Sequence, residues 1–296
     1  MLLQVDLVAS PVLPLMNGTP RTFRVAATYP RAAYFTDTAH WISLVVPGAL
    51  LPPDGIRIAT PMDLRVLFSH VDELRIGNGA LAFPDARRLS ISPRCRHWNP
   101  KPRLTRSCRQ ELHAAACQMV EDLLVTLPQE DPSVGLVLHS ALSMFDELTR
   151  ALANGHQSEV ITHTRRLAGL GPGLTPLGDD LLLGCSLALT ILAQEPAPDH
   201  DWLALRGLLA RIAAPATTAR SAAWLRQAGN GEFARELTAL AHALCAANAR
   251  LISRLLKRML TIGSSSGWAT AYGVNRALCL LLDHKGGRPL WHRRAG

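Results

Sequence analysis

The chemistry-bearing residues of this 296-residue chain are concentrated at positions 169–180, which read Gly-Leu-Gly-Pro-Gly-Leu-Thr-Pro-Leu-Gly-Asp-Asp. The closely spaced glycines lack Cβ atoms, so a ligand can come close to the backbone N–H groups. Thr175 and Pro176 predict a helix start, with threonine as the N-cap and proline at the first helical position. Unpaired N–H groups and the helix dipole make such a start an anion site. The candidate anion-binding residues of this segment are Gly171, Gly173, Leu174 and Thr175.

Two acidic residues, Asp179 and Asp180, follow in the first turn or two of this predicted helix, where the dipole stabilises carboxylates. The helix continues as the apolar run 181–193, so it should lie in the middle of a bundle. Burying an unpaired carboxylate is costly, so both side chains should bind a substrate donor, a cationic group or a divalent cation. We predict that Asp179 and Asp180 are catalytic, and they are candidate ligands for Mg²⁺. In the alternative interpretation, the glycines only shape a turn and the aspartates only complement the dipole.

Two further candidate groups lie at later helix starts. Residues 263–267, Gly-Ser-Ser-Ser-Gly, precede a predicted helix and offer hydroxyl and N–H groups. Thr217 and Thr218 lie one helical turn before Ser221, on one face. Ordinary helix capping would explain either group. The residues kept as candidate substrate contacts are Thr217, Ser221, Ser264, Ser265 and Ser266.

The sequence lacks motifs that are typical of several enzyme classes. The histidines form no H-x-x-x-H or H-E-x-x-H pair, which disfavours a zinc site. The chain has no Walker loop, which argues against nucleotide kinases. Residues 263–267 match the letters of G-x-S-x-G, but no strand is predicted before them, so they do not predict the strand-to-helix elbow of serine hydrolases.

The candidate residues fall in a region of helical periodicity. Leu112, Ala116, Met119 and Leu123 lie on one face of a first predicted helix that follows a proline-containing linker at 100–106. Strand-type alternation is absent from this half of the sequence. Further helices are predicted near residues 134–153, 158–168, 176–193, 201–213, 216–228, 233–246, 248–261 and 266–283.

The first hundred residues are typical of β structure. Short β-branched and aromatic runs are separated by Pro, Gly and Asp, and Asn78-Gly79 predicts a type I′ hairpin turn. Closely spaced strands without intervening helices favour a small barrel or sandwich. We therefore predict an α+β protein, with a β-rich domain at 1–102 and a larger helical domain at 103–296. The predicted strands are 22–28, 33–35, 41–46, 56–59, 74–76 and 80–83.

The formal net charge of +8 is compatible with nucleic acid, an acidic partner or anionic small substrates. One basic cluster, residues 87–109, has few Phe and Tyr residues, and no nucleic-acid-binding motif accompanies it. We therefore expect anionic ligands or a partner protein, and no nucleic acid.

The six cysteines form no C-x-x-C pair, and a chain of this length needs no disulfides, so we expect a reducing cytoplasm. The N-terminus lacks the basic segment of a signal peptide. The longest apolar stretch, 181–193, is shorter than the roughly 20 residues that span a bilayer. The expectation is a cytoplasmic protein without membrane segments.

Residues 169–184, which end in Gly-Asp-Asp-Leu-Leu-Leu-Gly, resemble the signature of the AllH family of oxamate carbamoyltransferase subunits. The resemblance is expected over most of the chain, and Leu177 departs from it because the family usually has a small polar residue there. Other positions that fit the family are 77–81, 98–100, Thr217, Thr218, Ser221 and 263–267.

This resemblance implies a subunit of a multi-subunit enzyme of ureide (allantoin) catabolism. Such a complex transfers a carbamoyl group between oxalurate and phosphate, giving oxamate and carbamoyl phosphate, together with subunits similar to acyl-CoA synthetases. The implied ligands are small anions: oxamate, oxalurate, carbamoyl phosphate or phosphate.

On this hypothesis, residues 171–174 and 264–266 hold phosphate or carboxylate oxygens. Asp179 or Asp180 then orients the carbamoyl nitrogen, or a divalent cation such as Mg²⁺ that polarises the carbonyl. An arginine should neutralise the substrate charge, and the sequence does not identify which one. Two alternatives stay open: a metal-dependent hydrolase or lyase using the two aspartates, and a non-catalytic scaffold subunit.

Overall fold

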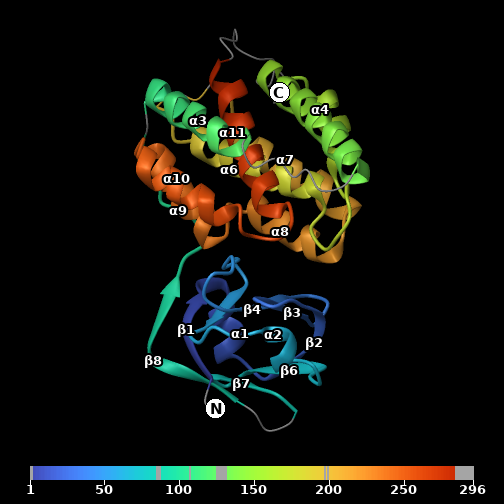
Figure 1. Ribbon diagram of the computed structural model, residues 1–296, viewed down its shortest axis with the longest axis vertical. Coiled ribbons are helices and arrows are strands. Elements are labelled where there is room, and N and C mark those ends of the chain that lie inside the picture. Colours follow the sequence, from blue (N-terminus) through green and yellow to red (C-terminus); the bar gives the residue numbers. More distant parts are fainter. Residues whose placement is uncertain are drawn as a thin grey trace, which may run out of the picture. The chain divides into compact units, whose positions relative to one another are not determined.

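The computed structural model describes residues 3–84, 88–106, 108–124, 132–196, 198 and 200–283. The chain divides into two compact units (Figure 1). The first, the barrel unit, comprises Met1–Lys101 together with Phe233–Glu236. The second, the helical unit, comprises Pro102–Glu232 and Leu237–Gly296.

The strands of the barrel unit form a closed barrel in the order β1-β5-β4-β3-β2-β6-β7-β8. Most neighbours are antiparallel, whereas β1 pairs with β8 and β4 with β5 in parallel. Closure leaves no unpaired sheet edge. The strands are β1 Leu3–Ala9, β2 Arg21–Thr28, β3 Ala32–Thr36, β4 Trp41–Val45, β5 Gly55–Ile58, β6 Glu73–Gly77, β7 Ala80–Ala82 and β8 Arg88–Trp98.

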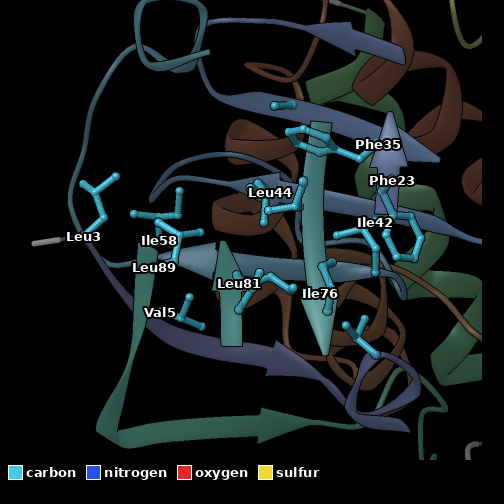
Figure 2. Close-up of a cluster of buried hydrophobic side chains, with 14 of the residues drawn as sticks. Leu3, Val5, Phe23, Phe35, Ile42, Leu44, Ile58, Ile76, Leu81 and Leu89 are labelled. Atoms are coloured by element: carbon cyan, nitrogen blue, oxygen red, sulfur yellow. The ribbon is translucent and has the colours of Figure 1, made fainter. Parts of the chain in front are cut away.

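Apolar side chains fill the interior of this barrel. Figure 2 shows residues from several strands gathered there, among them Phe23, Phe35, Leu44 and Ile76, all with no exposed surface. Alternation along the strands produces this arrangement: in β3, Ala33 and Phe35 are buried while the residues between and beside them are half-exposed. A barrel of this size has room inside for side chains and little else, so its interior is a structural core.

The predicted hairpin turn is confirmed. Asn78 and Gly79 both have positive φ, 51° and 73°, as a type I′ turn requires. Gly77 pairs with Ala80 across the turn, which joins β6 to β7.

The predicted α+β class is confirmed, and the β part is a barrel rather than a sandwich. The expectation of strands without intervening helices is wrong. Prolines start the η1 turn Ser10–Val12 and helix α1 Leu13–Asn17, and Asp63 caps α2 Leu64–Leu67 by accepting a hydrogen bond from the Arg65 N–H.

Two strands of the barrel, β1 and β8, were not among the predicted ones. In β1 the charge of Asp6 interrupts the apolar residues, but its carboxylate accepts two hydrogen bonds from Arg57 of β5, at 2.9 and 2.6 Å. Because Arg57 lies on another strand, the Asp6 charge is compatible with the barrel, although a charge within an apolar run disfavours a strand prediction. The pairing with Arg57 also lowers the pKa of Asp6, in spite of partial burial.

After residue 101 the described structure is helical, and each predicted helical range overlaps one of its helices. The helices are α3 Arg109–Leu124, α4 Pro132–Asn154, α5 Gln157–Leu167, α6 Leu177–Leu192, α7 Trp202–Ala213, the short η2 Ala214–Ala216, α8 Ala219–Gly229, α9 Arg235–Cys245, α10 Ala249–Met259 and α11 Ser266–Asp283.

Helix α6 is the core of the helical unit, as its sequence predicted, because every one of its residues is buried. It packs extensively against α11 (Figure 1). Glycines permit the close approach: a Cβ on Gly184 would lie 2.2 Å from the Thr270 carbonyl oxygen, and one on Gly273 would lie 2.5 Å from that of Leu181. Within the described ranges, no helix combines the length and apolarity needed to cross a membrane.

Candidate functional site

The glycines before α6 do not all serve the same purpose. Gly169, Gly171 and Gly173 all have positive φ, which favours glycine. A Cβ on Gly169 would lie 2.8 Å from the Ala216 carbonyl oxygen, so this glycine permits backbone packing. A Cβ on Gly173 would meet nothing within 4 Å, and its residue is exposed. Gly173 is therefore the point at which the loop opens to the surroundings.

The start of α6 differs from its prediction by one residue. Pro176, in an extended conformation, is the N-cap and Leu177 is the first helical residue, with no side-chain cap. The Thr175 hydroxyl instead lies 3.0 Å from the Ser266 hydroxyl at the start of α11. Thr175 thus connects the loop to a second helix start. Leu177 is buried, and a Cβ on Gly171 would lie 3.2 Å from its Cβ.

Both carboxylate oxygens of Asp179 accept hydrogen bonds from the protein itself. Its side chain is buried, its Oδ1 accepts from the Gly169 N–H at 2.9 Å, and its Oδ2 accepts a short hydrogen bond from the Thr217 hydroxyl. The carboxylate therefore joins the glycine loop, the start of α6 and the segment before α8.

Asp180 is in a different situation, although it is the next residue. It is 2% exposed, and its Oδ2 has no hydrogen-bond partner among the described residues. Burial raises the pKa of Asp180 well above its ordinary value of 3.8; the Ser266 hydrogen bond opposes this shift and the neighbouring Asp179 charge adds to it. The Asp180 Oδ2 is thus available to a ligand, and Ser266, which acts on Asp180, also contacts the Thr175 hydroxyl.

The start of α8 completes the surroundings of the loop. The Thr218 hydroxyl donates to the Leu174 carbonyl at 2.7 Å and, as N-cap, accepts from the Ser221 N–H at 3.2 Å. Ser221 itself is buried. Loop, α6 and α8 are thereby held together by hydroxyl groups that the sequence had singled out.

An arginine that the sequence did not single out lies on α8. Arg220 is 1% exposed, and its guanidinium lies 4.6 Å from the centre of the Trp224 ring. Such stacking stabilises a buried cation. The only signal in the sequence is the spacing of four between Arg220 and Trp224, which places them on one helix face. That spacing is too common to identify a site.

The three serines of the turn 264–266 before α11 do not all lie at the candidate site. Ser266 contacts the loop through Thr175 and acts on the pKa of Asp180 in α6, whereas Ser264 is exposed and Ser265 is half-buried. Of the three candidates, the structure thus brings Ser266 to the site.

The surroundings of the two aspartates do not form a metal cage. No group of three or more His, Cys, Asp and Glu side chains suited to a metal ion occurs in the part of the chain that the structure describes. Both oxygens of Asp179 already accept hydrogen bonds from the protein. A cation here would have Asp180 as its remaining carboxylate ligand among the described residues, and Mg²⁺ bound through a single carboxylate takes its other oxygens from substrate phosphate and water. The Mg²⁺ site stays a prediction, and we derive no chemistry through it.

Comparison with known proteins confirms the resemblance expected from the sequence, over less of the chain than expected: the match excludes positions 77–81 and 98–100. Residues 167–278 match the family model described as oxamate carbamoyltransferase subunit AllH. The matched segment contains α6, α8, the start of α11 and all the candidate site residues. No solved structure matches the chain.

Proposed function

Since residues 167–278 match the AllH family model, we propose that this chain is a subunit of a carbamoyltransferase complex and contributes substrate contacts. The ligands we propose are small anions with a carbamoyl group, namely oxamate, oxalurate or carbamoyl phosphate, together with phosphate as co-substrate. One observation carries the proposal. Asp180 is a buried carboxyl at a helix start, one of whose oxygens has no hydrogen-bond partner in the described part of the chain, and the loop before this helix has open space at Gly173.

The carbamoyl group matches the chemistry of Asp180. Its NH₂ donates hydrogen bonds, and a carboxylate in a water-poor environment is a strong acceptor for them. Formation of such a bond would compensate the ionised form of Asp180 for its burial. Asp180 thus orients the carbamoyl nitrogen in this proposal.

Other groups are suited to the rest of the substrate. The Ser266 hydroxyl acts on Asp180 and lies 3.0 Å from the Thr175 hydroxyl. These two hydroxyls can donate to the carbamoyl oxygen, which becomes more negative when phosphate oxygen attacks the carbon. The N–H groups of the glycine loop, with the buried Arg220 on the adjacent α8, supply positive potential for an anionic substrate. In this arrangement Asp179 positions the loop rather than contacting substrate.

Substrate has to reach a buried atom. The Oδ2 atom of Asp180 is covered, whereas Pro172 and Gly173 are exposed. We propose that the loop around Gly173 moves to admit the ligand and closes over it, which excludes water from the transfer.

Calorimetric titration of the full-length chain tests this proposal. Carbamoyl phosphate, oxamate, oxalurate and phosphate are titrated with and without Mg²⁺, first into the chain alone and then into the chain with its co-purified partner subunits. We expect Asp180→Asn to weaken binding of the carbamoyl ligands at least tenfold while phosphate binding changes less. The matched control is Asp54→Asn, which changes a buried carboxyl of the barrel that accepts from the Ser43 hydroxyl. The proposal is rejected if none of the ligands binds in either preparation, or if both variants bind like the unaltered protein.

A second candidate is a non-catalytic subunit in which the loop only packs. The close contact of Gly169 with Ala216 favours it, as does Gly178, whose Cβ would lie 2.0 Å from the Leu167 carbonyl oxygen. Turnover by the reconstituted complex separates the candidates. Asp180→Asn abolishes turnover if this chain contacts substrate, and leaves it intact if the segment is a scaffold.

A further inference from the structure

A second cluster of reactive side chains lies between α3 and α11, apart from the residues discussed above. His113 and Cys117 are one turn apart on α3, and Cys279 and Asp283 are one turn apart on α11. The His113 Nε2 lies 2.8 Å from Asp283 Oδ1, and the Cys117 sulfur lies 3.7 Å from the same Nε2 and 3.9 Å from Nδ1. If Nε2–H donates to Asp283, Nδ1 can accept the proton of the Cys117 thiol.

The packing of the two helices brings both thiols together. Two contacts between α3 and α11 bracket Cys279: the Asn275 side chain donates to the Ala116 carbonyl at 2.6 Å, and Asp283 pairs with His113. Cys279 lies one turn from each of these α11 residues. Cys117 is near enough to raise the pKa of Cys279, and Asn275 donates to the Cys279 sulfur at 3.7 Å.

We propose that Cys117 and Cys279 form a redox-active thiol pair that reacts reversibly with peroxide and closes a disulfide between α3 and α11. In the first step the Cys117 sulfur attacks one peroxide oxygen, the O–O bond breaks, and His113 accepts the thiol proton. The protonated His113 returns this proton to the departing hydroxide, so the products are a sulfenic acid on Cys117 and water. In the second step the Cys279 sulfur attacks the sulfenic sulfur, the S–O bond breaks, and the hydroxide leaves as water with the Cys279 proton. The two thiols lose two electrons and two protons, and hydrogen peroxide is reduced to two waters.

The surroundings of the two thiols assign the order of these steps. Cys117 is exposed, so peroxide reaches it directly, and a base lies beside it. Cys279 is half-buried, and burial, together with Cys117 and Asp283, raises the pKa of Cys279 to about 12, with Arg276 opposing the shift. Cys279 is therefore the poorer first nucleophile and the resolving thiol.

The test treats the reduced full-length protein with hydrogen peroxide and follows it by non-reducing peptide mass spectrometry. We expect a Cys117–Cys279 linked peptide, restored to two free thiols by dithiothreitol, and a higher melting temperature for the oxidised form. In Cys279→Ser a dimedone adduct should accumulate on Cys117. His113→Gln should slow Cys117 oxidation at least tenfold without changing the far-ultraviolet circular dichroism spectrum.

Cys108 provides the internal control, because it is also an exposed thiol of the helical unit. Preferential reaction of Cys117 over Cys108 supports the proposal. It is overturned if the two cysteines oxidise at the same rate, or if Cys117 and Cys279 both stay fully alkylatable after peroxide while the protein remains folded.

Discussion

Asp180 is the residue whose ionisation should be visible in the stability of the protein. Its pKa is higher in the folded state than the ordinary value of 3.8, so between these two values the folded state holds the extra proton. Stability contributed by this group is therefore fully present below about pH 4 and is lost as pH rises to the folded-state pKa, with a slope of up to about 1.4 kcal/mol per pH unit. Urea unfolding from pH 4.5 to 8 should show this loss in the unaltered protein and not in Asp180→Asn. Parallel profiles for the two proteins would contradict the assignment.

Asp179, by contrast, should matter mainly through its hydrogen bonds. Asp179→Asn places an amide donor against the Gly169 N–H or the Thr217 hydroxyl, so it should lower the free energy of unfolding by about 1–3 kcal/mol. Denaturant titration measures the loss. In a double-mutant cycle with Thr217→Val the two losses should not add, because both remove the same interaction. Strict additivity would show that the Thr217 contact contributes little.

At the scale of elements, the crossing of α6 and α11 depends on two glycines. Gly184→Ala should destabilise the protein by about 1–3 kcal/mol, because its Cβ would overlap the Thr270 carbonyl and push the helices apart. Gly273→Ala should behave alike. The matched control is Gly207→Ala on α7, where the new Cβ would meet only the movable end of Arg211, at 3.3 Å. There the gain in helix propensity, up to about 1 kcal/mol, should prevail. Thermal unfolding of the three variants checks the contrast, and equal effects would refute it.

At the scale of the whole molecule, the barrel and helical units each have their own internal contacts, so we predict two calorimetric transitions. Phe23→Ala leaves a cavity in the barrel core and should destabilise that unit by about 3–5 kcal/mol, lowering one transition. Leu187→Ala in α6 should lower the other by a similar mechanism, at about 2–5 kcal/mol. A single transition that both substitutions shift equally would show that the units unfold together.

Much of the architecture was predictable because it depends on local patterns. Helical periodicity located the helices after residue 101, and Asn78-Gly79 located the hairpin, since only certain residues tolerate positive φ. The apolar run after Asp180 identified α6 as the central helix. The same local signals failed for β1 and β8; in β1 the charge of Asp6 is satisfied by Arg57 of β5, a contact between strands that no local pattern shows.

The sequence by itself determined which segment is unusual and which kinds of chemical group it carries. Only the tertiary structure decided how those groups are used. Asp179 and Asp180 are neighbours with the same side chain. The Asp179 carboxylate accepts hydrogen bonds from Thr217 and Gly169, whereas the Oδ2 of Asp180 has no partner among the residues that the structure describes. The fully buried Arg220 and the thiol pair of Cys117 and Cys279 likewise depend on helix packing. Residue types and spacing fix local conformation, whereas burial and partners are set by contacts between positions far apart in the chain.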